Sequence, residues 1–299
     1  MKKILVTGGT VFVSRYIAEY YVKKGYDVYV LNRNSKKQSK GVTLIEADRH
    51  HLGEVLRTYS FDVIIDTAYN SNDVELLLDA VGEYKDYILI SSSAVYPEYV
   101  PQPFKEDTVL ALNKYWGKYG TDKIEAEKVL MKRNPNAYIV RPPYLYGSMN
   151  NVYREAFVFD CALADRKFYL PKDGEMQLQF FHIHDLCRFI DNILTNRPKQ
   201  HIFNVGNKET VSIREWVELC YQVVGKEVTF VPVYEDVEQR NYFSFYNYEY
   251  YLDVSKQYKQ METVKSLKEG LEEAFNWYIN NMDKVNKKPY IDYIDNNLV

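Results

Sequence analysis

Short apolar runs alternate with helical patterns through the first two thirds of the chain, and this rhythm constrains the fold more than any other feature. The runs rich in β-branched residues are KILVT (3–7), DVYVL (27–31), TLIEA (43–47), DVIIDT (62–67), DYILIS (86–91) and AYIVR (137–141). Their nearly continuous apolar character is typical of strands covered on both faces. Helices are expected between them at 14–24, 51–59, 73–84 and 119–132. The alternation predicts an α/β fold with a doubly wound parallel sheet.

The rhythm breaks after Arg141. The remaining elements are expected to be a proline-stiffened turn at 141–147, strands at 177–183 and 201–205, and helices at 152–165, 185–194, 212–224 and 266–279. The cluster YFSFYNYEYY (242–251) is aromatic but mixed with polar residues. A half-exposed strand or an interface packed on the core explains it better than a ligand platform.

Composition excludes several classes of protein. The net charge of −3 and the pI near 6.0 argue against a nucleic-acid partner. No run of about 18 apolar residues occurs, so no membrane span is expected, and the cytoplasm is the expected location. The widely spaced Cys161, Cys187 and Cys220 predict buried thiols in a reducing compartment. No metal is expected, since His182 and His184 alternate along a strand and would face opposite sides.

The first strand runs into LVTGGTVFVS, a turn that resembles a dinucleotide-binding loop with missing glycines. The pattern T-G-x-x-G-x-x-G keeps Gly8, whereas Val11 and Ser14 occupy the second and third glycine positions. A β-branched residue at Val11 should resist a positive φ, while Ser14 is small enough to substitute. The spacing alone does not distinguish a working cofactor site from a degenerate one.

The end of the next strand bears on cofactor choice. NAD-binding folds usually place a carboxylate there to bind the adenosine ribose, but this strand ends Leu31-Asn32-Arg33. A guanidinium at Arg33 can pair with a 2′-phosphate, which favours NADP over NAD. The alternative is a solvated arginine in a basic loop that also holds Lys36, Lys37 and Lys40.

A Y-x-x-x-K spacing joins Tyr119 and Lys123 on one face of an expected helix. An ammonium beside a phenol favours the phenolate, so this pair suits proton transfer near neutral pH. The spacing alone is weak evidence, because Tyr20 and Lys24 match it by chance. The hydroxyls of SSSAVY (91–96) strengthen it, since they follow a strand at the edge where doubly wound sheets bind ligands.

Five motifs now stand in order: TGGTVF, SSSAVY, YGTDK, RPPYLYG and QFFHIHD. In this order they resemble the extended short-chain dehydrogenase/reductases, the NAD(P)-dependent epimerase/dehydratase family, from Lys2 to about Gly206. The resemblance continues weakly through 252–256 and 266–278. The GGTxF opening is similar to a branch that includes chloroplast stem-loop-binding proteins and bacterial sugar-epimerase-like reductases.

The resemblance implies roles for particular residues. Tyr119 would be the catalytic acid/base, Lys123 would lower its pKa and hold the nicotinamide ribose, and Ser92 would hydrogen-bond the substrate oxygen. The implied cofactor-binding residues are Thr7, Gly8, Gly9, Thr10, Val11, Phe12, Asn32, Arg33, Asp48, Ala68, Tyr119 and Lys123. The substrate candidates are Ser93, Tyr144, Arg154, Gln179 and Arg240. Arg154 and Gln179 are as easily structural, and a solvated surface arginine explains Arg240 better than a phosphate contact does.

The implied architecture is a dinucleotide-binding Rossmann domain of residues 1–143 plus about 177–205. A smaller C-terminal α/β substrate-binding part would span about 144–176 plus 206–299. The implied function is an NAD(P)-dependent oxidoreductase or epimerase acting at a hydroxyl/carbonyl carbon, with a nucleotide sugar as substrate and a homodimer as assembly. Ser93-Ala94 replaces the Asp-Glu pair of sugar 4,6-dehydratases, so that type is rejected. The competing hypothesis is a degenerate, non-catalytic nucleotide- or RNA-binding protein.

Overall fold

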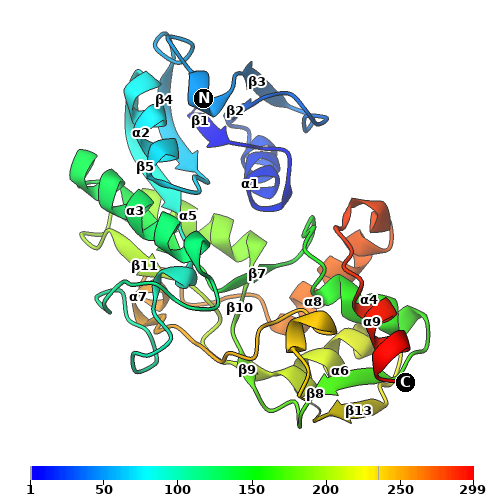
Figure 1. Ribbon diagram of the computed structural model, residues 1–299. Coiled ribbons are helices and arrows are strands. Elements are labelled where there is room, and N and C mark those ends of the chain that lie inside the picture. Colours follow the sequence, from blue (N-terminus) through cyan, green and yellow to red (C-terminus); the bar gives the residue numbers. More distant parts are fainter. Residues whose placement is uncertain (1, 235) are drawn as a thin grey trace. The chain divides into compact units, whose positions relative to one another are not determined.

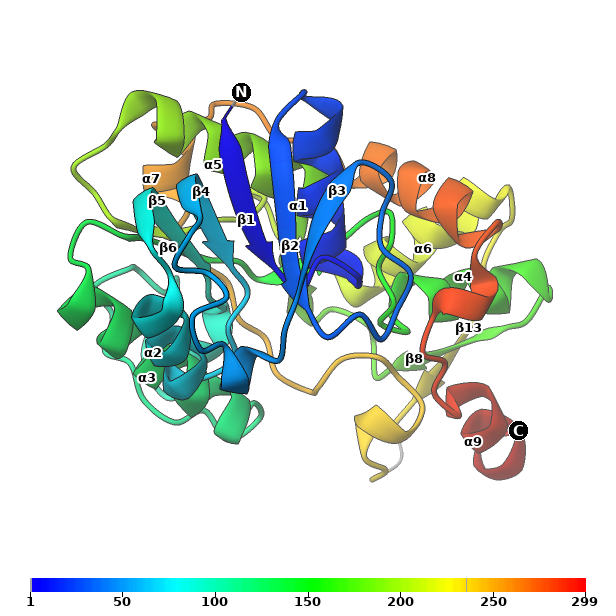
Figure 2. The ribbon, with the colours of Figure 1, turned by 90° about the horizontal axis from the view of Figure 1, so that it is seen from above.

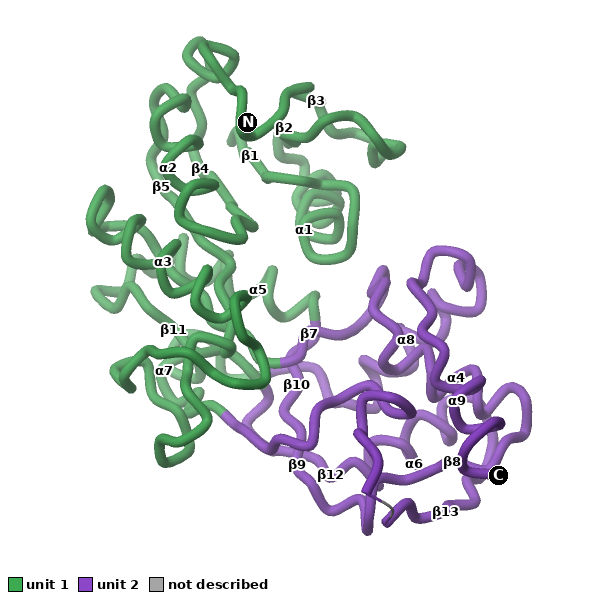
Figure 3. Tube along the Cα trace, viewed as in Figure 1, with its two compact units in different colours: residues 1–143, 183–206, 252–263 green, residues 144–182, 207–251, 264–299 purple. Residues whose placement is uncertain are grey.

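The computed structural model describes residues 2–234 and 236–299, which form two compact units (Figure 3). Unit 1 comprises residues 1–143, 183–206 and 252–263, and unit 2 comprises residues 144–182, 207–251 and 264–299. Two segments lie outside the expected boundaries. Residues 177–182 belong to unit 2, where Phe180–His182 pairs with Tyr144–Tyr146, and residues 252–263 belong to unit 1, where Leu252 bridges to Phe104.

Unit 1 is built on a seven-stranded sheet in which every neighbouring pair is parallel (Figure 1). Its strand order is β11-β6-β5-β4-β1-β2-β3. The strands are β1 (Lys3–Thr7), β2 (Asp27–Asn32), β3 (Val42–Glu46), β4 (Ser60–Asp66), β5 (Glu83–Ile90), β6 (Tyr138–Arg141) and β11 (Ile202–Asn204). This confirms the predicted Rossmann-type sheet. The order reverses between β1 and β4, and such a switch point is where open α/β sheets bind ligands.

Helices cover both faces of this sheet (Figure 2). Helices α1 (Phe12–Lys23) and α5 (Ile183–Asn196) pack together on one face, and α2 (Ser71–Ala80) and α3 (Lys118–Arg133) pack together on the other. The buried side of α5 repeats at three- and four-residue spacing through Ile183, Leu186, Ile190 and Ile193, which is the stripe that a core-facing helix requires. A short helix, α7 (Ser255–Tyr258), lies against β11.

Unit 2 consists of three small strand pairs and several helices. The pairs are β7 (Tyr144–Tyr146) with β10 (Phe180–His182), β9 (Gln177–Leu178) with β12 (Val211–Ser212), and β8 (Phe168–Pro171) with β13 (Phe230–Val233). The helices are α4 (Glu155–Leu163), α6 (Ile213–Val224), α8 (Leu267–Tyr278) and α9 (Tyr290–Asn297). Capping boxes at Ser212 with Glu215 and at Ser266 with Glu269 fix the starts of α6 and α8.

Some expected elements are wrong. Residues 51–59 form turns after a single 3₁₀ turn (Arg49–His51), because Gly53, at φ +51, breaks the helical path. The expected helix at 73–84 ends at Ala80, since β5 already begins at Glu83.

The aromatic cluster 242–251 contains no strand, although it packs on the core as expected. Its buried rings are Tyr242, Phe243, Phe245, Tyr248 and Tyr250. The three cysteines are buried and free, as predicted. Within residues 2–234 and 236–299, none of the helices combines the length and apolar character needed to cross a bilayer.

Candidate active site

Two glycines make the turn that follows β1. Gly8 and Gly9 adopt φ values of +85° and +84°, where a side chain would be strained. Gly8 N–H donates to the Leu31 carbonyl at 2.9 Å, which ties the turn to the end of β2. A Cβ on Gly9 would lie 2.5 Å from Val30 Cγ1. Phe12, which begins α1, also has a positive φ of 25°, so the positive φ angles of this loop lie at Gly8, Gly9 and Phe12.

Val11 therefore does not carry the strain that the sequence suggested. It precedes α1 with φ −135° and ψ 139°, an extended conformation that β-branched residues favour. Ser14, at the third glycine position, donates its hydroxyl to the Val11 carbonyl at 3.1 Å. A Cβ on Gly8 would meet Ser14 Oγ at 2.9 Å, so serine fills the available space. Val11 thus avoids a positive φ, as its β-branched side chain should, and the loop does not require one at this position.

The start of α1 fits a dinucleotide pyrophosphate. Among the described residues, no side chain caps the helix at Val11, and its first turn contains no acidic residue. The first N–H groups of a helix lack internal partners and carry the positive end of the helix dipole. They are therefore suited to bind an anion. The loop keeps the backbone features of a working phosphate site.

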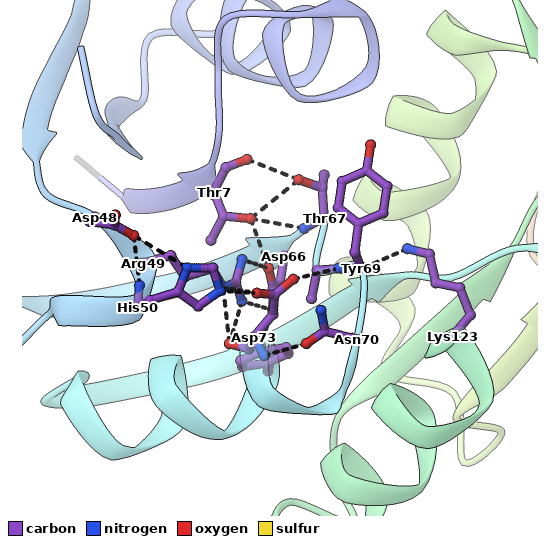
Figure 4. Close-up of polar contacts among 12 residues, drawn as sticks. Thr7, Asp48, Arg49, His50, Asp66, Thr67, Tyr69, Asn70, Asp73 and Lys123 are labelled. Atoms are coloured by element: carbon purple, nitrogen blue, oxygen red, sulfur yellow. Dashed lines mark hydrogen bonds and ion pairs between the residues drawn. The ribbon is translucent and has the colours of Figure 1, made fainter. Parts of the chain in front are cut away.

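A buried ionic network that no sequence motif indicated supports the ends of β1 and β4 (Figure 4). The Asp66 carboxylate accepts hydrogen bonds from Thr7 Oγ1 at 2.7 Å, from Arg49 Nη1 and Nη2 at 2.8 and 2.7 Å, and from Tyr87 Oη at 2.5 Å. Burial alone would raise the pKa of Asp66, but the Arg49 guanidinium and these hydrogen bonds hold it below its usual value. The feature of the sequence that could have indicated this network is Asp66 itself, a carboxylate at the end of an apolar strand.

The same arginine fixes the loop that follows β4. Arg49 Nε and Nη2 donate to the Asp73 carbonyl at 3.0 and 2.8 Å. The Asp73 carboxylate accepts from Tyr69 N–H at 2.9 Å, and Asn70 Oδ1 accepts from Asp73 N–H at 2.9 Å. The loop that carries Ala68 is therefore rigidly held (Figure 4).

The two residues at the end of β2, Asn32 and Arg33, differ in their contacts. Asn32 Nδ2 donates to the Gly8 carbonyl at 2.6 Å and to Gln38 Oε1 at 3.1 Å, so this amide braces the glycine turn. Arg33 is exposed. Asp48 accepts a hydrogen bond from His50 N–H at 2.9 Å, and this bond, helped by the charge of Arg33, lowers the pKa of Asp48.

Lys123 lies buried between the ends of two neighbouring strands. Its Nζ donates to the Ala68 carbonyl at 2.6 Å, after β4, and to the Ile90 carbonyl at 2.9 Å, at the end of β5. Burial lowers the pKa of Lys123 to about 8. An ammonium has three N–H bonds, so one remains beyond these two for a ligand hydroxyl.

Tyr119 lies beside this ammonium, as the Y-x-x-x-K spacing predicted. The Lys123 Nζ is 5.9 Å from the centre of the Tyr119 ring. The tyrosine is 40% exposed, so its side chain is accessible to a ligand, whereas only 4% of Lys123 is exposed.

Ser92 stands at the start of the 3₁₀ turn Ser93–Val95. Its Oγ accepts from Ala94 N–H at 3.2 Å, which leaves the hydroxyl proton available for donation. Ser93 is buried, and its N–H donates to the Pro142 carbonyl at 2.9 Å. Helix α3 meets this turn directly at Gly120, where a Cβ would lie 2.4 Å from the Ala94 carbonyl oxygen. The structure thus packs the helix of Tyr119 against the segment of Ser92.

Replacing Gly120 by alanine is expected to destabilise unit 1 by about 1–3 kcal/mol, because the new methyl group overlaps a backbone oxygen that cannot move freely. Thermal unfolding measures the change. Thr121→Ala is the matched control, since it changes the next residue of the same helix and adds no atom. Equal losses in the two variants would contradict the close packing of α3 on Ala94.

The remaining substrate candidates belong to unit 2. Gln179 is buried and donates to the Asn207 carbonyl at 2.9 Å, which is a structural contact. The Arg154 guanidinium lies 5.5 Å from the centre of the Tyr144 ring. Arg240 donates to the carbonyls of Phe243 and Ser244 and lies 4.9 Å from the Tyr246 ring. No cluster of three or more metal-ligating side chains occurs in the part of the chain that the structure describes.

A doubly wound sheet with a glycine turn, a free helix start and a buried lysine beside a tyrosine defines a dinucleotide-fold protein. The model of the NAD dependent epimerase/dehydratase family matches residues 4–206. The chain therefore belongs to that family, whose members are enzymes of the extended short-chain dehydrogenase/reductase type. The resemblance inferred from the ordered motifs is confirmed.

Individual relatives and structures agree with this family. The chain is 27% identical over 302 residues to the chloroplast stem-loop binding protein of 41 kDa b from Arabidopsis thaliana, covering 92% of this chain and 79% of the relative. It is 24% identical over 330 residues to a UDP-glucuronate 4-epimerase from Thermodesulfobacterium geofontis, covering 94% and 97%. The structure of a UDP-glucuronic acid 4-epimerase from Bacillus cereus with UDP-glucuronic acid and NAD shares the fold. Its TM-score is 0.72 at 20% identity, over 93% of this chain and 99% of that one.

Proposed function

We propose that this protein is an NAD(P)-dependent oxidoreductase or epimerase that acts at a hydroxyl/carbonyl carbon of a nucleotide sugar. The observation that carries the proposal is the buried Lys123 ammonium, fixed by the Ala68 and Ile90 carbonyls beneath the ring of Tyr119. Burial of this ammonium is costly, and the two backbone carbonyls offset only part of the cost, because the pKa of Lys123 still falls to about 8. A catalytic pair uses it to hold a cation beside a proton-transferring phenol.

The proposed division of labour follows from these positions. Tyr119 takes the proton of the substrate hydroxyl, or returns it to a carbonyl, and Ser92 donates a hydrogen bond to the same oxygen. Lys123 supplies the adjacent positive charge, and its remaining N–H binds the ribose. The nicotinamide, when bound, accepts or returns the hydride. The residues proposed to hold the cofactor are Thr7, Gly8, Gly9, Thr10, Val11, Phe12, Asn32, Arg33, Asp48, Ala68, Tyr119 and Lys123.

NADP is the cofactor that the end of β2 favours. Asn32 is occupied with bracing the glycine turn, so its side chain does not replace the carboxylate that binds a ribose in NAD-dependent folds. Arg33 is the exposed cation next to it, and it can pair with a 2′-phosphate.

Replacing Arg33 by alanine is expected to weaken NADPH binding about tenfold and to leave NADH binding unchanged, since only NADPH carries the 2′-phosphate. Fluorescence titration with each nucleotide measures the ratio. The control is Lys37→Ala, which removes an exposed charge from the same loop. Equal weakening of NADPH and NADH by Arg33→Ala would show that the arginine is not the selector.

Two arginines of unit 2 support a nucleotide sugar as substrate. Arg154 and Arg240 each lie against a tyrosine ring, and guanidinium groups are suited to bind the phosphates of such a molecule. The similar epimerase described above is named for UDP-glucuronate, and the solved structure contains UDP-glucuronic acid. Location in the cytoplasm and assembly as a homodimer stay predictions.

A second candidate function is RNA binding, which the similarity to a protein named for stem-loop binding favours. The net charge of −3 opposes it. Tight, structure-dependent binding of a stem-loop RNA at physiological salt would favour this candidate. Weak binding that ignores RNA structure would remove it.

The experiment that tests the proposed function is a turnover assay with UDP-glucose, UDP-galactose and UDP-glucuronic acid, each supplied with NADP⁺ or NAD⁺. We expect conversion of at least one sugar nucleotide, and NMR of the sugar ring detects it. Glucose 1-phosphate is the control substrate without a nucleoside, and it should react poorly. Binding of the cofactors without conversion of any hydroxyl substrate would contradict the proposed activity.

A further inference from the structure

Tyr69 is a large aromatic residue that the family motifs do not explain. It follows Ala68 in the loop after β4 and is 67% exposed. Its backbone is nevertheless fixed, because its N–H donates to the Asp73 carboxylate at 2.9 Å and Asp73 is held in turn by Arg49 and Asn70. An exposed ring on a rigid loop at the ligand-binding edge of a sheet is in position to contact a ligand.

The ring of Tyr69 belongs to the same cluster as the proposed catalytic pair. Its centre lies 6.4 Å from that of Tyr119, in an edge-to-face arrangement, and 5.6 Å from Lys123 Nζ. The Lys123 ammonium thus lies against two aromatic rings. Figure 4 shows the Tyr69 ring beside this ammonium, with the hydroxyl pointing away from it.

We propose that Tyr69 contacts the nicotinamide riboside end of the bound dinucleotide and provides an aromatic surface on which that end packs. The inference rests on the proposed function, since Lys123 is expected to hold the nicotinamide ribose. A group bound by the remaining N–H of Lys123 lies next to the Tyr69 ring, which is 5.6 Å from the same nitrogen. The ring offers a flat apolar surface for a planar heterocycle.

The alternative is a solvent-exposed side chain without a ligand, as single exposed apolar residues often are. The two interpretations differ in whether the nicotinamide half of the dinucleotide contacts the Tyr69 ring. Removal of Tyr69 should weaken a ligand that contains nicotinamide and should spare one that ends at the ribose. NADPH and 2′-phospho-ADP-ribose form such a pair.

Tyr69→Ala is expected to raise the Kd of NADPH about tenfold, the size of one lost ring contact, and to leave the Kd of 2′-phospho-ADP-ribose within about twofold. Tyr69→Phe keeps the ring and should bind both ligands as the unaltered chain does. Tyr99→Ala is the matched control, because Tyr99 is 70% exposed in the same unit. Calorimetric titration measures all four proteins, and thermal unfolding verifies their folding.

Three outcomes would overturn the inference. Equal weakening of the two ligands by Tyr69→Ala would place the effect at the adenosine half or in the loop itself. If Tyr69→Ala weakened the binding of neither ligand, the ring would not contact the dinucleotide, and the proposed function would still stand. Failure of the unaltered chain to bind either ligand would remove the proposed function together with this inference.

Discussion

Replacing Tyr119 by phenylalanine is expected to lower kcat by about 10²–10⁴-fold and to leave cofactor affinity and thermal stability nearly unchanged. The substitution removes one hydroxyl, which is the group proposed to carry the proton, and general acid–base catalysis contributes about that factor. Because the side chain is 40% exposed, little packing is lost. Steady-state turnover of the reactive sugar nucleotide measures the change, and a nucleotide titration verifies that the cofactor still binds.

The chain contains its own control for this experiment. Tyr20 on α1 and Lys24, the residue that caps its end, repeat the Y-x-x-x-K spacing. However, Tyr20 Oη donates to Asp191 at 2.6 Å, and burial together with that carboxylate raises the pKa of Tyr20. Its phenol therefore cannot serve as a proton carrier near neutral pH. Tyr20→Phe should cost about 1 kcal/mol of stability and no activity. If Tyr119→Phe kept full turnover, the catalytic assignment would fail.

Replacing Lys123 by methionine is expected to abolish turnover and to change how stability depends on pH. The pKa of Lys123 falls from 10.5 in an exposed lysine to about 8 because burial disfavours the charge. One pKa unit corresponds to about 1.4 kcal/mol, so the buried charge costs the folded state about 3 kcal/mol. A methionine carries no such cost.

The sign of the pH dependence follows from proton binding. Between pH 8 and 10.5 the unfolded chain holds the proton of this lysine more tightly than the folded chain does, so the unfolding free energy of the unaltered protein rises with pH in that range. The stability of Lys123→Met relative to the unaltered protein should therefore fall by about 3 kcal/mol from pH 8 to 10.5.

Urea unfolding at a series of pH values measures this difference. Lys128→Met is the matched control, because Lys128 lies on the same helix, is exposed and pairs only with Glu125 among the described residues. It should show no such pH dependence and normal turnover. A pH-independent difference between Lys123→Met and the unaltered protein would contradict a buried cation at this position.

The parallel sheet could be predicted from sequence because its strands carry a strong local signal. Runs such as DVIIDT and DYILIS are apolar on both faces, and only a sheet covered by helices on both sides buries them. Lys123 beside Tyr119 could also be predicted, since a four-residue spacing on a helix fixes which side chains meet.

Other features depend on contacts that no local pattern encodes. The positive φ angles of the loop lie at Gly8, Gly9 and Phe12 and not at Val11, because backbone angles are set by how the turn meets β2 and α1. The Asp66–Arg49 pair joins residues from different elements, so neither spacing nor periodicity indicates it. The failed helix at 51–59 shows that short-range apolar periodicity is overridden where a glycine and a short connection bring the chain back to the sheet.

A fluorescence titration of the unaltered protein with NADPH and NADH tests the central claim most directly, which is that this chain retains a working dinucleotide site. We expect saturable binding of NADPH in the micromolar range, with a change in nicotinamide fluorescence, and weaker binding of NADH. Absence of binding by either nucleotide at millimolar concentration would contradict it, and Lys123 and Tyr119 would then be remnants of a lost activity.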